Sequence, residues 1–122
     1  MAIKVKNYKV LRALLSVEYA PILIQIILWV IHRYSETVIT EGYRQGDPRT
    51  HGTIPCRAVD LRSWIFENPG AVRDDINKHW EYDPERPNMQ ACVYHEVIDK
   101  KTGKSKGWHF HVQSHPNTKR RV

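Results

Sequence analysis

The chain has 122 residues, which is enough for one domain with a single core and too few for two. Hydrophobic residues at 41% and charged residues at 26% are ordinary globular values and argue against bulk disorder. The net charge of +6 suits an anionic partner, yet the chain has no arginine-rich helix and no metal-finger cysteine spacing, so we expect no nucleic-acid partner. Cys56 and Cys92 do not make a disulfide framework and predict reduced thiols in a chain made in the cytoplasm.

The first third of the chain is basic and then apolar. Residues 1–19 are a lead-in with no clear assignment, and Pro21 suits the first turn of a helix that runs to about Tyr34. Three polar residues recur every seven positions and form one narrow stripe on this helix: Glu18, Gln25 and His32. The charge-free run 19–31 is shorter than the roughly 20 residues of a membrane span. We therefore predict a buried core helix, no clear signal peptide and no stable membrane span.

The middle of the chain alternates between short strands and polar segments. Residues 37–40 are β-branched throughout and predict a buried strand, and residues 57–61 predict a second one. Between them, residues 41–55 form a polar loop. Asn68 and Pro69 are typical of a helix start, and the helix that follows has one apolar face, made by Val72, Ile76 and Trp80.

The last third predicts a β-hairpin. Residues 91–98 and 108–113 alternate in polarity, and residues 99–107 between them are typical of a turn. The order of elements predicts an α+β domain: a small, mostly antiparallel sheet with a C-terminal hairpin, packed by two or three helices. We assign residues 20–115 to this single domain, which we expect to be a monomer, and residues 116–122 to a basic tail.

Two histidines of the hairpin and one aspartate are candidate metal ligands. Side chains alternate along a strand, so His109 and His111 share one face, and the other face turns apolar residues to the core, namely Trp108, Phe110 and Val112. Asp60 faces away from the core at the end of its strand, and His51 precedes it on a loop that can fold back. One carboxylate and two imidazoles make a three-ligand zinc set with a fourth position open for water.

These residues lie in a wider pattern: Ile39-Thr40-Glu41-Gly42-Tyr43-Arg44, His51, Arg57-Ala58-Val59-Asp60 and His109-Phe110-His111-Val112-Gln113. In order and context the pattern resembles the zinc D-alanyl-D-alanine carboxypeptidases and L-alanyl-D-glutamate endopeptidases, a family of hedgehog-type fold that includes bacteriophage endolysins. The resemblance implies one zinc ion per chain on His51, Asp60 and His111. It implies that Arg44 binds substrate carbonyl or carboxylate oxygens and helps stabilise the tetrahedral intermediate. It also implies a peptidoglycan peptide as substrate and action at the bacterial cell wall.

The sequence departs from that family at two points. Eight residues separate His51 from Asp60 where the family usually has six, which makes Cys56 an alternative ligand. Many members carry an acidic general base three residues before the last ligand, and here that position is Trp108. The alternative function is therefore a catalytically inactive, zinc-stabilised binding module, a character that the hedgehog signalling domain has.

The hairpin offers a substitute for the missing base. Matching the apolar residues of its two strands gives the pairs Val93 with Val112 and Val97 with Trp108. This register places Glu96 opposite His109 on the metal face, where the two side chains would manage protons. A slip of one residue would place His95 there instead.

Overall fold

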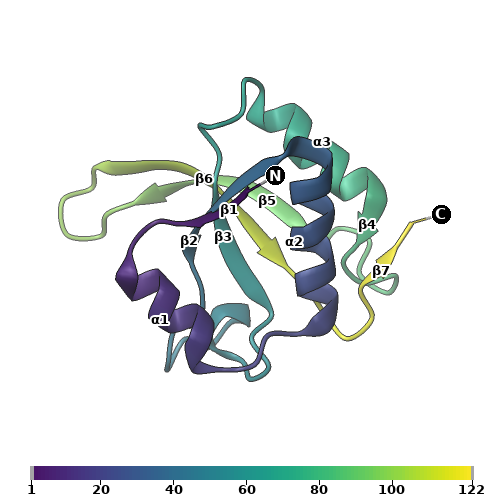
Figure 1. Cartoon of the computed structure of the whole chain (residues 1–122), viewed down its shortest axis with the longest axis horizontal. Helices are drawn as coiled ribbons and strands as arrows, with labels where there is room; N and C mark the ends of the chain where they lie inside the picture. The colour runs from purple at the N-terminus through teal and green to yellow at the C-terminus, as the bar shows by residue number, and fades with distance from the viewer. Residues whose placement is uncertain (1, 122) are drawn as a thin grey trace.

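The computed structural model describes residues 2–121 and has an α+β fold (Figure 1), which confirms the predicted class. Its elements in chain order are β1 (Ala2–Val5), α1 (Tyr8–Ser16), α2 (Pro21–Tyr34), β2 (Glu36–Glu41), the short 3-10 helix η1 (Thr50–Gly52), β3 (Ala58–Arg62), α3 (Pro69–His79), β4 (Trp80–Glu81), β5 (Cys92–Ile98), β6 (Ser105–Gln113) and β7 (Lys119–Arg120). Five strands form a mostly antiparallel sheet in the order β1-β2-β3-β6-β5, and β4 pairs with β7.

The helices begin where the sequence predicts. Pro21 is the first residue of α2, where a missing N–H costs nothing, and the helix ends at Tyr34. Asn68 caps α3, because its side-chain oxygen accepts a hydrogen bond from the Ala71 N–H at 3.1 Å. The predicted lead-in contains a third helix, α1, which Asn7 caps in the same way.

The core lies between one face of the sheet and helices α2 and α3. Alternate residues of β3 and β6 point into it: Val59, Leu61, Phe110 and Val112. The helices contribute Leu23, Ile26, Val30, Val72 and Ile76. The α2 segment is therefore a core helix, as predicted, and within residues 2–121 no helix combines the length and apolarity that a membrane crossing requires. Covering this face with helices leaves the opposite face of β3 and β6 free for polar side chains.

Both ends of the described chain join the fold. Residues 2–5 of the lead-in form β1, which pairs in parallel with β2 at the edge of the sheet. Of the predicted basic tail, residues 119–120 form β7 against β4. Met1 and Val122 lie outside the described residues.

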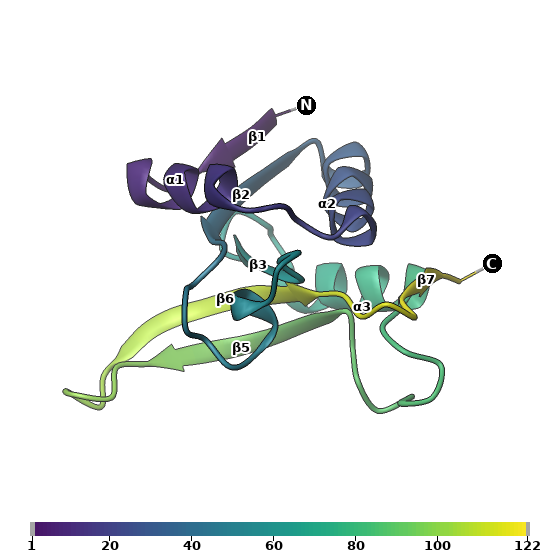
Figure 2. The same ribbon diagram turned by 90° about the horizontal axis from the view of Figure 1, so that it is seen from below.

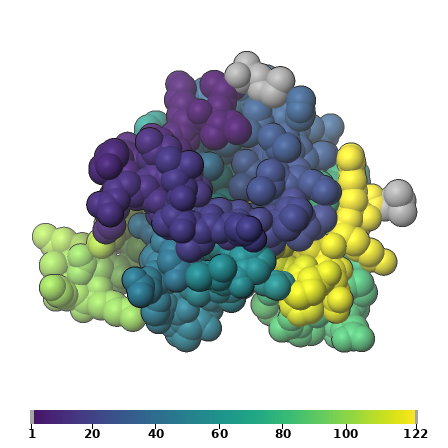
Figure 3. All heavy atoms as spheres, turned by 60° about the horizontal axis from the view of Figure 1, so that its bottom comes forward, coloured from purple at the N-terminus to yellow at the C-terminus, as the bar shows by residue number. Residues whose placement is uncertain are grey.

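The hairpin extends past the rest of the sheet as a projecting arm (Figures 2 and 3). Only residues 109–113 of β6 pair with β3, whereas the earlier part of β6 pairs with β5 alone. Trp108 lies on this arm and is 48% exposed, so its predicted place in the core is wrong. The physical reason is that the helices that cover the sheet do not extend under the arm.

The predicted register of the hairpin is also wrong, by one residue. His95 pairs with His109, and Glu96 pairs with Trp108. The pairing shifts again between Glu96 and Ile98, and Gly107 on the facing strand has a φ of 95°. A bulge of this kind changes the register by one position, so apolar matching across the hairpin does not fix which residues face each other.

Candidate metal centre

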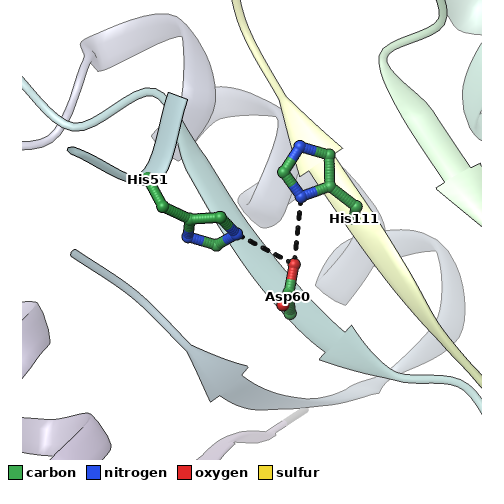
Figure 4. Close-up of side chains that lie close together, drawn as sticks. All are labelled: His51, Asp60 and His111. Carbon is green, nitrogen blue, oxygen red and sulfur yellow. Dashed lines mark hydrogen bonds and ion pairs between the residues drawn. The ribbon is translucent and has the colours of Figure 1, made fainter. Parts of the chain in front are cut away.

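The three predicted ligands come together on the sheet face opposite the helices (Figure 4). Asp60 lies on β3 between two core residues, so its carboxylate points away from the core. His111 is its direct cross-strand partner on β6, so the two side chains share that face. His51 comes from η1, in the loop between β2 and β3. Strand pairing thus sets two ligands, and a folded loop supplies the third.

Backbone contacts hold the loop that carries His51. The N–H of Arg44 donates to the His51 carbonyl oxygen at 2.8 Å, and the N–H of Arg57 donates to the Thr50 carbonyl oxygen at 3.1 Å. Gly52 follows His51 at a place with no room for a side chain, since a Cβ there would lie 1.8 Å from the Asp47 carbonyl oxygen. Close packing of main chain on main chain therefore fixes the position of the His51 ring.

The ligand atoms of the three residues lie within 4.8 Å of one another. Asp60 Oδ1 is 3.1 Å from His51 Nε2 and 3.1 Å from His111 Nδ1. His51 and Asp60 are 2% and 4% exposed, and His111 is half-buried at the wall of the cleft. The group is therefore shielded on the protein side and open on the side of His111.

The outer nitrogen of each imidazole is bonded to a fixed oxygen. His51 Nδ1 lies 2.9 Å from the Gly42 carbonyl oxygen, which only accepts, so this nitrogen carries the proton. His111 Nε2 lies 3.2 Å from Gln113 Oε1. The amide of Gln113 is oriented by its own Nε2, which donates to the Gln90 carbonyl oxygen at 2.8 Å. Both rings consequently turn an unprotonated nitrogen towards Asp60.

With this tautomer assignment the group could hold a metal cation. Two imidazole lone pairs and a carboxylate oxygen face one another, and none of the three has a proton to donate to the others. A metal cation satisfies all three at once, and hydrogen bonds from the outer ring nitrogens are the usual support of metal-bound histidines. Burial acts to raise the pKa of Asp60, but when His111 and His51 are doubly protonated they donate hydrogen bonds to the carboxylate, and these hold that pKa well below its usual value. The carboxylate is thus ionised, the form that binds metal.

Cys56, the alternative ligand, does not join this group. Its thiol is fully buried, and the Sγ lies 3.4 Å from the Ala58 carbonyl oxygen and 3.7 Å from that of His51. Burial raises the pKa of the Cys56 thiol, which keeps it protonated and a poor metal ligand. The longer spacing between His51 and Asp60 is absorbed by the loop.

Two further histidines stand beside the three ligands. His109 Nε2 is 3.4 Å from Asp60 Oδ2, and the His95 ring packs edge-on against the His109 ring at 4.6 Å between centroids. Burial lowers the pKa of both imidazoles, which favours their neutral form. His109 is where the sequence predicts it. Glu96 does not lie opposite His109 as predicted, because its side chain is on the other face of the hairpin. The residue opposite His109 is His95, as the alternative register with a one-residue slip would have it.

The site opens into a cleft of about 1170 Å³ between the loop after β2 and the hairpin arm. Arg44 lines this cleft, with its side chain half exposed. Its Nε lies 3.5 Å from Asp47 and 3.8 Å from Glu41, so two carboxylates hold the guanidinium at the rim. A cleft of this volume is at least as large as typical ligand-binding pockets.

Two supporting residues were missed as site residues. Gln113 and Gly42 are in the sequence pattern that suggested the site, but only the fold reveals that they bond the outer nitrogens of the two histidines. Gly42 also has no space for a side chain: a Cβ would lie 2.7 Å from the Tyr19 hydroxyl and 3.3 Å from Leu14. That hydroxyl accepts a hydrogen bond from the Tyr43 N–H at 2.9 Å.

Compared with known proteins, the chain matches no family model, no curated protein and no solved structure.

Proposed function

We propose that this chain is a zinc metallopeptidase that hydrolyses peptides of the bacterial cell wall. The observation that supports the proposal is the convergence of three electron-pair donors, from His51, Asp60 and His111, at the wall of an open cleft. Two imidazoles and one carboxylate are a frequent ligand set of catalytic zinc, which keeps a fourth position for water or substrate. A bound zinc ion supplies the Lewis acidity that activates water for attack on a peptide carbonyl.

Residues beside the ligands fit the remaining tasks of peptide hydrolysis. His109 lies within 3.4 Å of Asp60, so its ring is close enough to the ligands to accept a proton from water and pass it to the leaving amine. His95 packs against that ring and keeps it in place. Arg44 at the rim offers planar N–H donors to a substrate carboxylate or to a developing oxyanion. Glu96 has no part in this scheme.

The wall-peptide substrate rests on the resemblance of the sequence to the D-alanyl-D-alanine carboxypeptidases and L-alanyl-D-glutamate endopeptidases. The charge of the cleft agrees with it. Its lining contains six lysines and arginines against three acidic residues, and one of these three is Asp60 itself. A cleft with this excess of positive charge favours an anionic substrate.

Metal analysis and a hydrolysis assay together test the proposal. Mass spectrometry of the metal content should find about one zinc per chain in the purified protein, with a sharp loss in His51→Ala and in Asp60→Asn. His79→Ala, whose ring lies outside the cleft, is the matched control and should keep the metal. Purified wall peptides incubated with the zinc-loaded protein should yield new termini by chromatography and mass spectrometry. Full zinc occupancy in Asp60→Asn would disprove the ligand assignment, and full occupancy by iron, which uses the same donor set, would replace zinc.

A binding module stabilised by zinc is the second candidate. It is favoured by one observation: neither Trp108 nor Glu96 provides an acidic base beside the ligands. In that case the protein binds zinc and wall peptide but releases no product. Arg44→Lys distinguishes the two candidates further, since it should lower turnover by about tenfold or more in an enzyme while zinc stays bound.

A further inference from the structure

A second arginine lies on the cleft face of the sheet. Arg62 follows Asp60 by one strand period on β3, so both side chains point into the cleft. β2 runs antiparallel to β3, and Glu41 at its end is level with Asp60. After Glu41 the chain continues in the direction of the start of β3. In this loop the Arg44 N–H donates a hydrogen bond to the His51 carbonyl oxygen. Arg62 thus follows Asp60 along β3, whereas Arg44 lies on the loop after β2, which leaves the sheet in the opposite direction.

The guanidinium of Arg62 is held but not neutralised. It lies over the ring of Trp64, with Cζ 4.7 Å from the ring centroid. Stacking uses the flat face of a guanidinium and leaves the N–H groups at its edge free to donate. Among residues 2–121, no carboxylate forms an ion pair with Arg62, whereas Arg44 has two acidic neighbours.

The surroundings of Arg62 strengthen its positive potential. Three lysines line the cleft with it: Lys6, Lys100 and Lys106. Within the described part of the chain, Lys106 is the one of the three that forms an ion pair, with Asp99 at 3.8 Å, and all three are exposed. Trp64 itself is 72% exposed, and among residues 2–121 its ring forms no aromatic pair and has one cation–π contact, with this guanidinium. An arginine stacked on an exposed ring inside a cleft is suited to bind a planar anion.

We propose that Arg62, held by Trp64, is a carboxylate-binding subsite, and that the preferred substrate is an acidic peptide whose side-chain or main-chain carboxylate binds on the Arg62 side of the scissile bond. This inference rests on the proposed peptidase function for the position of that bond. Arg62 binds the carboxylate through its two edge N–H groups, and Trp64 is a positioning residue that presents the guanidinium in one orientation.

The test compares two synthetic wall peptides that differ at one group. One carries a γ-linked D-glutamate with a free α-carboxylate, and its twin carries the same carboxylate as an amide. We expect the zinc-loaded protein to prefer the free acid by about tenfold or more in kcat/KM. Titration calorimetry on chelator-treated protein should give the same preference in Kd, because Arg62 and Trp64 need no metal.

Variants assign the preference to the subsite. Arg62→Gln should bring the ratio between the twins close to one, and Arg62→Lys should keep only part of it, since the charge remains and the planar fork is lost. Trp64→Ala should weaken the preference and Trp64→Phe should restore it. Arg73→Gln, which removes an arginine of α3 outside the cleft, is the matched control and should keep the full ratio.

The outcomes separate the subsite from the peptidase function. Hydrolysis of both twins at equal rates would overturn the subsite and leave the function standing. A preference in Kd without any hydrolysis would support the subsite and overturn the function. Equal binding of the twins, no binding of either, or a full preference in Arg62→Gln would overturn the subsite.

Discussion

The amide of Gln113 links the candidate metal site to the loop before β5, and its removal is a direct test of the tautomer assignment. Gln113 Oε1 lies 3.2 Å from His111 Nε2, and its Nε2 donates to the Gln90 carbonyl oxygen at 2.8 Å. Gln113→Leu keeps a similar volume at this buried position and removes both bonds. The outer nitrogen of His111, Nε2, then keeps only the Thr50 hydroxyl, 3.4 Å away.

Two effects follow, and their magnitudes can be stated separately. Loss of the hydrogen bond to the carbonyl of the exposed residue Gln90 lowers the free energy of unfolding by about 0.5–1.5 kcal/mol. The His111 ring is free to rotate or to change tautomer, so its lone pair no longer faces Asp60 in every molecule. Loss of such a supporting bond lowers metal affinity by about 10- to 100-fold.

Zinc affinity should be measured by competition with a chromogenic chelator, next to urea unfolding of the metal-free protein. Gln25→Leu, an exposed glutamine on α2, is the control for the substitution itself and should change neither quantity. A folded Gln113→Leu variant with unchanged zinc affinity would refute the argument, because His111 would then not depend on Gln113 for its tautomer.

Three further predictions use other parts of the molecule. His95→Gln should slow wall-peptide hydrolysis by about 100-fold in steady-state kinetics, whereas Glu96→Gln should stay within about twofold; equal losses would contradict the observed register. Leu23→Ala should lower the free energy of unfolding by about 3–5 kcal/mol in urea titrations, since this α2 side chain is fully buried, and a loss below about 1 kcal/mol would show that α2 is not core. Burial acts to raise the pKa of Asp75, but hydrogen bonds, led by the one from the Tyr34 hydroxyl, outweigh burial and hold that pKa below its usual value. The ionised carboxylate therefore stabilises the fold above the unfolded-state pKa of about 3.9, and this contribution is lost as the pH falls. Asp75→Asn should therefore cost about 1 kcal/mol at pH 7, and the difference from the unmodified protein should shrink below about pH 4 in pH-dependent unfolding; a difference that persists at pH 2 would contradict it.

Periodicity and end signals were enough to predict most of the fold. Pro21 and Asn68 mark helix starts by their own backbone and side-chain chemistry, so α2 and α3 could be placed without tertiary information. Asp60 and His111 could be predicted to face the same way because side chains alternate along strands, whereas the loop residue His51 was joined to them by the resemblance to the zinc peptidases. The small parallel strand β1 could not, since a strand of four residues at a sheet edge depends on a distant partner, β2.

The hairpin register could not be predicted from polarity. The rule that apolar residues share the core face holds only where helices cover the sheet, and the arm extends beyond that cover. Val93 and Val97 line the cleft together with His95, so their apolar character reflects the wall of a cleft and not the core. The prediction paired these two valines with apolar residues of β6. That pairing shifted the predicted register by one residue and put Glu96, in place of His95, opposite His109.

The close contact between Gly42 and the Tyr19 hydroxyl has a consequence for how the site responds to the N-terminal segment. The Gly42 carbonyl holds His51, and the Tyr19 hydroxyl, which also donates to the Ala13 carbonyl oxygen at 2.9 Å, packs against Gly42 from the other side. We therefore expect the docking of α1 and the proposed zinc binding to be thermodynamically linked, and such linkage is reciprocal. Zinc should slow limited proteolysis between α1 and α2, and a change that loosens α1 should weaken zinc binding by the same factor.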